Sequence, residues 1–146
     1  MTRVSTTRDA SGVTIDAAVP PAFAEAIEQF NSWRFYDCHE TLEDIWREVG
    51  AKSSESQLAN FYQGIIKAAA GYHHLLRDNY EGTLKVLGDT FRLLSPYRPK
   101  TMGLDVDALL AAIQATLDGV KELGPGHLRQ YDRSLIPTID WDAPTG

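Results

Sequence analysis

Apolar residues recur every three or four positions along most of the chain, which is the spacing of an amphipathic helix. Five segments carry this pattern, and their predicted ranges are 22–31, 35–49, 57–77, 80–94 and 106–123. The third segment is apolar almost all the way round, as expected of a helix packed among others. The pattern therefore predicts an all-α fold, a single compact bundle of about five helices.

Residues that begin or end helices separate these segments. Pro21 precedes the first segment, and proline is tolerated in the first turn of a helix. Gly50 and Gly124 follow the second and fifth segments, where glycine favours a helix end. Pro96 ends the fourth segment, because proline disfavours helical backbone at the residue before it. Asp105 is predicted to cap the fifth.

The chain divides into three parts by composition. Residues 1–19 are rich in Thr, Ser, Asp and Ala and predict a flexible arm, extended or disordered. Residues 20–124 form the predicted helical domain, and 125–146 an irregular tail that is ordered by packing on the bundle. The second and fourth helices begin alike, with Tyr36-Asp37-Cys38 and Tyr80-Glu81-Gly82, which indicates helical-hairpin units.

Composition and charge narrow the class of protein. The 146 residues are 43% hydrophobic and 23% charged, as is ordinary for one domain, and 14 basic against 20 acidic residues give a net charge of -6. This balance does not support nucleic-acid binding. No apolar run approaches the roughly 20 residues of a membrane span. Cys38 stands alone, and residues 1–18 lack the apolar run of a secretory signal, so we expect a cytoplasmic protein.

Candidate chemistry lies on the second predicted helix. At about 100° of rotation per residue, Glu43 lies roughly 40° from His39, and Trp46 lies roughly 20° from it on the other side. The same stripe includes Phe35 and Leu42, so the imidazole and the carboxylate are predicted to be buried within an apolar face. A buried carboxylate needs a partner, because its unpaired burial costs several kcal/mol. His39 is the nearest candidate.

Several short motifs around this stripe occur together. They are Phe30-Asn31, Phe35-Tyr36, the pattern H-x-x-x-E-x-x-W at His39, Glu43 and Trp46, the run Tyr62-Gln63-Gly64-Ile65-Ile66-Lys67 with Ala68 to Ala70, and His73-His74. In these motifs the chain resembles the family of small bacterial and archaeal helical proteins called domain of unknown function 309. The resemblance covers about residues 23–94.

The resemblance implies an all-α fold, no established activity, and metal binding by the His/Glu/Trp motif. This suggestion carries over to His39 and Glu43 as ligands, with Trp46 as the third motif position. The sequence departs from the family in the turn before the motif, which often holds a glycine and here reads Ser32-Trp33. The departure leaves the motif itself intact.

The residues also allow a direct argument about a divalent metal ion. A histidine and a carboxylate one helical turn apart can both reach one ion, but two ligands are too few. If the next helix runs antiparallel, Glu43 faces Gln63. The pair His73-His74 then lies level with Asn31-Ser32, roughly 10 Å beyond His39 at 1.5 Å per residue. This arithmetic argues against a three-ligand zinc site.

Three interpretations of the constellation stay open. A buried His39–Glu43 pair, closed by Gln63 and covered by Trp46, would lock two helices in register. On this interpretation Glu43→Ala costs roughly 1–3 kcal/mol. The alternatives are a metal site, in which a harder ion in an oxygen-rich site is favoured over zinc, and a small-molecule pocket.

Enzyme activity is not favoured by the sequence. No nucleophile or oxyanion donor is identifiable near His39, and Cys38 lies roughly 100° away around the helix. His73 and His74 are expected to be one buried and one exposed residue, because adjacent helical positions do not face each other. The alternative function is a helical-hairpin scaffold that binds a protein partner or a second copy of the chain.

Overall fold

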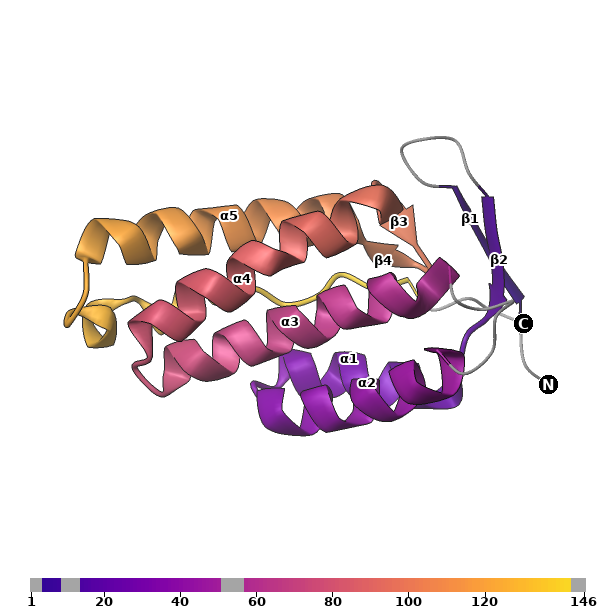
Figure 1. Cartoon of the computed structure of the whole chain (residues 1–146), viewed down its shortest axis with the longest axis horizontal. Coiled ribbons are helices and arrows are strands. Elements are labelled where there is room, and N and C mark those ends of the chain that lie inside the picture. The colour runs from indigo at the N-terminus through magenta and orange to yellow at the C-terminus, as the bar shows by residue number, and fades with distance from the viewer. Residues whose placement is uncertain (1–3, 9–13, 51–56, 143–146) are drawn as a thin grey trace.

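A computed structural model describes residues 4–8, 14–50 and 57–142. Its helices are α1 (Pro21–Asn31), α2 (Phe35–Gly50), α3 (Ala59–Leu76), α4 (Tyr80–Leu94) and α5 (Val106–Leu123). Figure 1 shows α3 and α4 running side by side, with α1 and α2 along one side of this pair and α5 along the other. The predicted all-α bundle of about five helices is confirmed.

Side-chain caps account for two helix starts, of which the one at Asp105 was predicted. The carboxylate of Asp105 accepts a hydrogen bond from the backbone N–H of Ala108 at 2.9 Å, and the side chain of Asn79 accepts one from Gly82 at 2.9 Å. Each satisfies a backbone donor that has no partner within its helix. The observed helices differ from the predicted ranges only near their ends, where α2 includes Gly50 and a 3₁₀ turn precedes α3. The predicted loop at 51–56 lies outside the described residues.

Two short strands precede the helices. β1 (Val4–Arg8) pairs antiparallel with β2 (Thr14–Ala18), and Val4 lies opposite Ala18 in the register. The sequence predicts an extended or disordered arm here, and the pairing of the strands was not predicted. Threonine, valine and isoleucine favour extended backbone, but the composition of a polar arm does not reveal which extended segments will pair.

A second, shorter pair of strands lies between α4 and α5. β3 (Lys100–Thr101) pairs antiparallel with β4 (Leu104–Asp105) through a two-residue turn at Met102 and Gly103. Their φ angles are 52° and 83°, and two-residue hairpin turns of the commonest kind require φ above zero at both positions. This hairpin reverses the chain before α5.

The segment after α5 has no α-helix in its described part. It contains 3₁₀ turns at Leu128–Gln130 and Arg133–Leu135. The far end of this segment is hydrogen-bonded to Asn31 of α1. The side-chain amide of Asn31 donates to the carbonyl of Ile139 at 3.2 Å and accepts from the N–H of Ile139 at 2.6 Å. Apolar residues of this segment are buried against the bundle: Leu128, Tyr131, Ile136 and Ile139.

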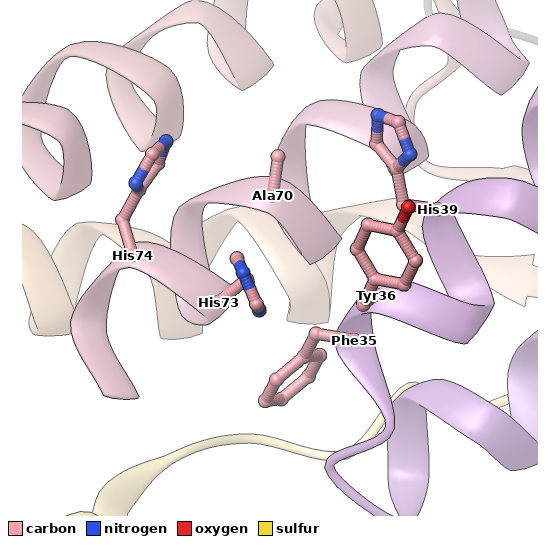
Figure 2. Close-up of a pocket in the computed structure, with 6 residues that line it drawn as sticks. All are labelled: Phe35, Tyr36, His39, Ala70, His73 and His74. Carbon is pink, nitrogen blue, oxygen red and sulfur yellow. The ribbon is translucent and has the colours of Figure 1, made fainter. Parts of the chain in front are cut away.

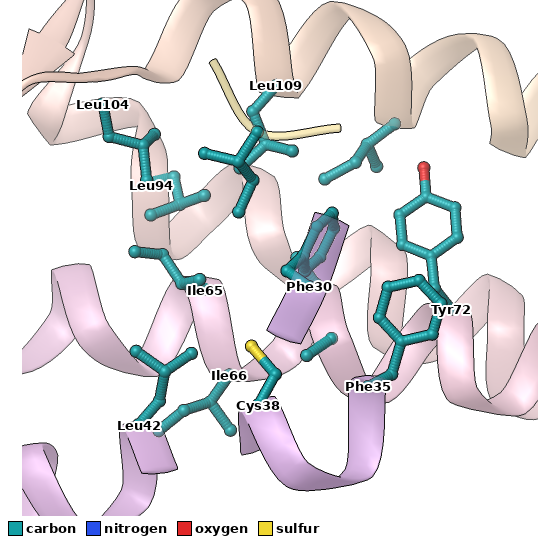
Figure 3. Packing of buried hydrophobic residues seen from close by; sticks show 14 of the residues in the cluster. Phe30, Phe35, Cys38, Leu42, Ile65, Ile66, Tyr72, Leu94, Leu104 and Leu109 are labelled. Carbon is teal, nitrogen blue, oxygen red and sulfur yellow. The ribbon is translucent and has the colours of Figure 1, made fainter. Parts of the chain in front are cut away.

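The core surrounds α3, which buries residues on most of its sides (Figure 3). Two glycines of α3 allow α4 to pack closely. A Cβ at Gly64 would lie 2.4 Å from Leu94, and one at Gly71 would lie 2.3 Å from Leu87. None of the described helices is both long and apolar enough to cross a membrane.

Candidate functional site

The buried face of α2 is not the stripe that carries the His/Glu/Trp motif. α2 buries Phe35, Cys38, Leu42 and Ile45, a spacing that follows the helical period (Figure 3). The side chains of His39 and Glu43 each keep 30% of their surface exposed. The prediction that this pair lies within the apolar core is therefore wrong.

The physical reason is a rotation of α2 about its axis. Phe35 and Leu42 belong to the observed buried stripe and also flank the predicted one, so helical periodicity alone does not choose between the two. Packing against α1 and α3 turns Cys38 and Ile45 inward. Trp46 is left partly buried, packed against the edge of the core.

The motif nevertheless forms a cluster of possible metal ligands. Nδ1 of His39 lies 3.7 Å from Oε2 of Glu43 and 3.7 Å from Oε1 of Glu40. One ligand atom from each of the three residues lies within 4.8 Å of the others. These distances exceed a hydrogen bond, and Nδ1 of His39 is shielded from solvent without a hydrogen-bond partner among the described residues.

Glu40 is the residue of this cluster that sequence reasoning missed. It follows His39 directly, so a helical wheel places its Cβ about 100° away on another face. Its side chain is long enough to return toward the imidazole. The position of Glu40 directly after His39 could have indicated this contact. A helical wheel shows only the direction in which a side chain leaves the helix, not where a long side chain ends. Glu43 also lies 3.7 Å from Arg47, whose cation partly balances the charge of Glu43.

The structure does not bring Gln63 into this cluster. Gln63 lies half-buried on α3, and among the described residues it forms no hydrogen bond with His39 or Glu43. The neighbouring Lys67 instead lies 3.9 Å from Asp89 of α4. The three grouped ligand residues, His39, Glu40 and Glu43, therefore all come from α2.

A pocket of about 190 Å³ lies between α2 and α3, beside the cluster (Figure 2). The ring of Tyr36 is stacked on the imidazole of His39, with 6.4 Å between ring centroids, and lies 6.0 Å from that of His73. The lining residues are Phe35, Tyr36, His39, Ala70, His73 and His74.

This arrangement corrects the predicted register between the two helices. His73-His74 was predicted to lie level with Asn31-Ser32, but both histidines line the same pocket as His39. Counting residues from a connecting loop assumes parallel axes, whereas packed helices cross at an angle. The expectation of one buried and one exposed histidine is also wrong, since both are half-buried.

The environment of the pocket disfavours positive charge on His73. Partial burial lowers its pKa below the ordinary value, and the neighbouring Arg77, His74 and His39 lower it further. Nδ1 of His74 lies 3.1 Å from the side-chain amide nitrogen of Asn79. Because an amide nitrogen only donates, this Nδ1 is the acceptor and the neutral ring carries its proton on Nε2.

Cys38 does not contribute a nucleophile to this region. Its thiol is fully buried, and burial raises its pKa to about 12. A thiol must lose its proton to act as a nucleophile, so Cys38 is unreactive in the folded protein. The site described here is thus a set of imidazole, carboxylate and aromatic groups.

Comparison with known proteins finds a family model that covers this site. The family model called "Domain of unknown function (DUF309)" matches residues 23–86, a range that contains the cluster and all the pocket residues. This match confirms the resemblance noted in the sequence.

One relative extends the similarity beyond that range. The chain is 27% identical over 124 residues to "Uncharacterized protein YpuF" of Bacillus subtilis (strain 168). The match covers 83% of this chain and 66% of the relative, so the chain spans about two thirds of the relative's length. The descriptions of the family and of this relative assign no activity.

Proposed function

We propose that the chain binds a divalent metal ion through His39, Glu40 and Glu43. The observation that supports this function is the close approach of three ligand atoms, within 4.8 Å of one another, around an imidazole nitrogen that lacks a partner among the described residues. Structural pairing alone explains this geometry poorly, because 3.7 Å is too long for a hydrogen bond.

The spacing suits an ion of ordinary size. Metal–nitrogen and metal–oxygen bonds of about 2.0–2.2 Å place two ligands of one ion roughly 3 to 4 Å apart. The observed 3.7 Å separations fall within this span. Small rotations of exposed carboxylates would complete the geometry, and water would fill the remaining positions.

The donor set favours some ions over others. One imidazole and two carboxylates suit manganese, iron(II) or zinc, and the excess of oxygen favours the harder ions of this group. All three ligands come from neighbouring turns on the partly exposed side of one helix, so we expect reversible binding. The role that follows is that of a metal-binding protein with open coordination positions.

Metal titration of defined variants tests this function. The full chain is purified without a histidine tag, treated with EDTA, and titrated with MnCl₂ and ZnCl₂ by calorimetry. We expect one saturable site that is lost in His39→Ala and in Glu43→Gln. Asp44→Asn is the matched control, because it removes the same charge from the same helix at an exposed position outside the cluster. Equal binding by all variants would refute the function.

A second candidate function is a scaffold that associates with another copy of the chain. The turn between α1 and α2 favours it, because Trp33 holds φ at 63° with 42% of its surface exposed. Bulky residues rarely adopt this conformation, so the fold itself does not explain a tryptophan here. Sedimentation equilibrium tests the idea: a mass that rises with concentration and falls to that of a monomer in Trp33→Gly would support it.

The remaining expectations concern location and partners. A cytoplasmic location and the lack of nucleic-acid binding stay predictions from charge and from the single cysteine. The division of the chain into an arm, a helical domain and a tail also stays a prediction.

A further inference from the structure

The pocket between α2 and α3 has features that the metal cluster does not use. It shares only His39 with the cluster, and its other walls come from Phe35 and Tyr36 on α2 and from Ala70, His73 and His74 on α3. Figure 2 shows the rings of Phe35, Tyr36 and His73 lying around one space. Residues of α2 and α3 thus form this pocket, whereas the three residues of the metal cluster all lie on α2.

The size of the pocket suits a ligand with one ring. Its volume is about 190 Å³, and an engineered protein cavity of about 150 Å³ holds benzene. A benzene ring with one small substituent therefore fits. Tyr36 keeps 60% of its surface exposed, so a polar substituent can reach solvent at this wall.

The walls favour an aromatic ring over an aliphatic chain of similar volume. Phe35 offers a buried ring, and Tyr36, His39 and His73 offer further ring faces and edges. Aromatic rings prefer offset or edge-to-face contacts with one another, and such contacts add to the gain from burial. Only Ala70 contributes an aliphatic surface.

The lining of the pocket offers hydrogen-bond donors to a polar substituent. No carboxylate lines it, while three imidazoles do, and Arg77 lies close enough to lower the pKa of His73. Of the acids on α2, Asp37 is paired with Arg34 at 3.0 Å, and Glu40 and Glu43 lie around Nδ1 of His39. An anionic substituent would accept hydrogen bonds from imidazole N–H groups, as the ring nitrogens of histidine can donate.

We propose that this pocket is a second binding site, which takes a small monocyclic aromatic acid such as benzoate. The ring lies among Phe35, Tyr36 and Ala70, and the carboxylate faces the histidines of α3. The site does not require the metal ion.

Binding of benzoate by the EDTA-treated full chain tests this site. We expect saturable binding of benzoate, at least about tenfold weaker binding of benzamide, and no measurable binding of acetate or benzylamine. In NMR spectra, benzoate should shift the ring protons of His73 and His74. Tighter binding of benzylamine than of benzoate, or equal binding of acetate, would overturn the proposal.

Two variants locate the ligand in the pocket. Ala70→Leu fills the space and should weaken benzoate binding at least about tenfold, whereas Ala111→Leu makes the same change at an exposed position of α5 and should have no effect. If Ala70→Leu does not fold, Tyr36→Ala decides, because its exposed ring can be removed without opening the core. Unchanged binding in a folded pocket variant overturns the proposal.

A third variant separates this site from the metal site. Glu43→Gln should lose metal binding and keep benzoate binding, because Glu43 does not line the pocket. Loss of benzoate binding in Glu43→Gln would show that the acid sits on the cluster and would overturn a separate site. Benzoate binding by the unmodified chain, if that chain binds no metal, would support the pocket and refute the proposed metal function.

Discussion

Nδ1 of His39 lies 3.7 Å from the carboxylate of Glu43, one helical turn further along α2, and both side chains remain 30% exposed. This relationship is that of a half-exposed pair on a helix surface, in which the Nδ1 atom itself is shielded from water. Exposed ion pairs of this kind contribute about 0–1 kcal/mol, since water screens the charges and the side chains lose freedom. The pair therefore does little to hold α2 against α3.

We predict that Glu43→Gln changes the free energy of unfolding by less than about 1 kcal/mol when metal is removed with EDTA. The expected change is smaller than the loss of stability that the sequence predicted for a buried His39–Glu43 pair. Urea denaturation measures the change, and Glu40→Gln should behave alike, because its carboxylate lies at the same distance from His39. A loss above about 2 kcal/mol in Glu43→Gln would mean that its carboxylate is paired away from water.

Helix ends were predictable from local chemistry. Asp105 and Asn79 act through their own side chains on backbone N–H groups three residues away, so the information lies within one turn of sequence. The pairing of β1 with β2 is not local in this sense, and neither composition nor helical period reveals it.

The candidate site was only partly predictable, because part of its geometry is not local in the sequence. The motif correctly brought His39 and Glu43 together, because residues one turn apart share a helix face. Their exposure depends on how α2 rotates against its neighbours, and the meeting of Tyr36 with His73 depends on how α2 crosses α3. These are properties of packing between helices, which a single helical wheel does not contain.

Close packing of α3 on α4 makes a prediction about glycine. In Gly71→Ala the new Cβ would lie 2.3 Å from Cδ2 of Leu87 and 3.3 Å from its backbone nitrogen, so the side chain and the helix must move. Overpacking of this kind costs roughly 1–3 kcal/mol. Gly88→Ala on α4 is the control, since its Cβ meets nothing within 4 Å, and there alanine should stabilise the helix by up to about 1 kcal/mol. Thermal denaturation that ranks Gly71→Ala above wild type would contradict the close approach.

A buried hydrogen bond between α3 and α5 makes a further prediction. The hydroxyl of Tyr72 lies 2.8 Å from that of Thr116, which also donates to the carbonyl of Ala112 at 3.1 Å. The tyrosine must then be the donor to Thr116, and burial raises its pKa above the ordinary value despite this bond.

Removing the acceptor should therefore cost more than removing the donor. Thr116→Val leaves a buried tyrosine hydroxyl unpaired, at roughly 1–3 kcal/mol, while Tyr72→Phe leaves Thr116 bonded to Ala112 and should cost about 0.5–1.5 kcal/mol. The double variant should cost less than the sum of the two single variants. Chemical denaturation of all three measures this, and strict additivity would show that the two hydroxyls do not interact.

The last prediction concerns Cys38 and pH. Burial raises the pKa of its thiol to about 12, while the unfolded chain has the ordinary value near 9. The folded state thus holds its proton where the unfolded state releases it, so the stability of the fold should fall as pH rises above about 9. At pH 8.5 the native thiol should resist Ellman's reagent and react only as the chain unfolds in urea. Ser32→Cys provides the control, because that exposed position adds one thiol that reacts at once. Rapid labelling of Cys38 in the unmodified native chain would mean that α2 opens readily or does not bury this face.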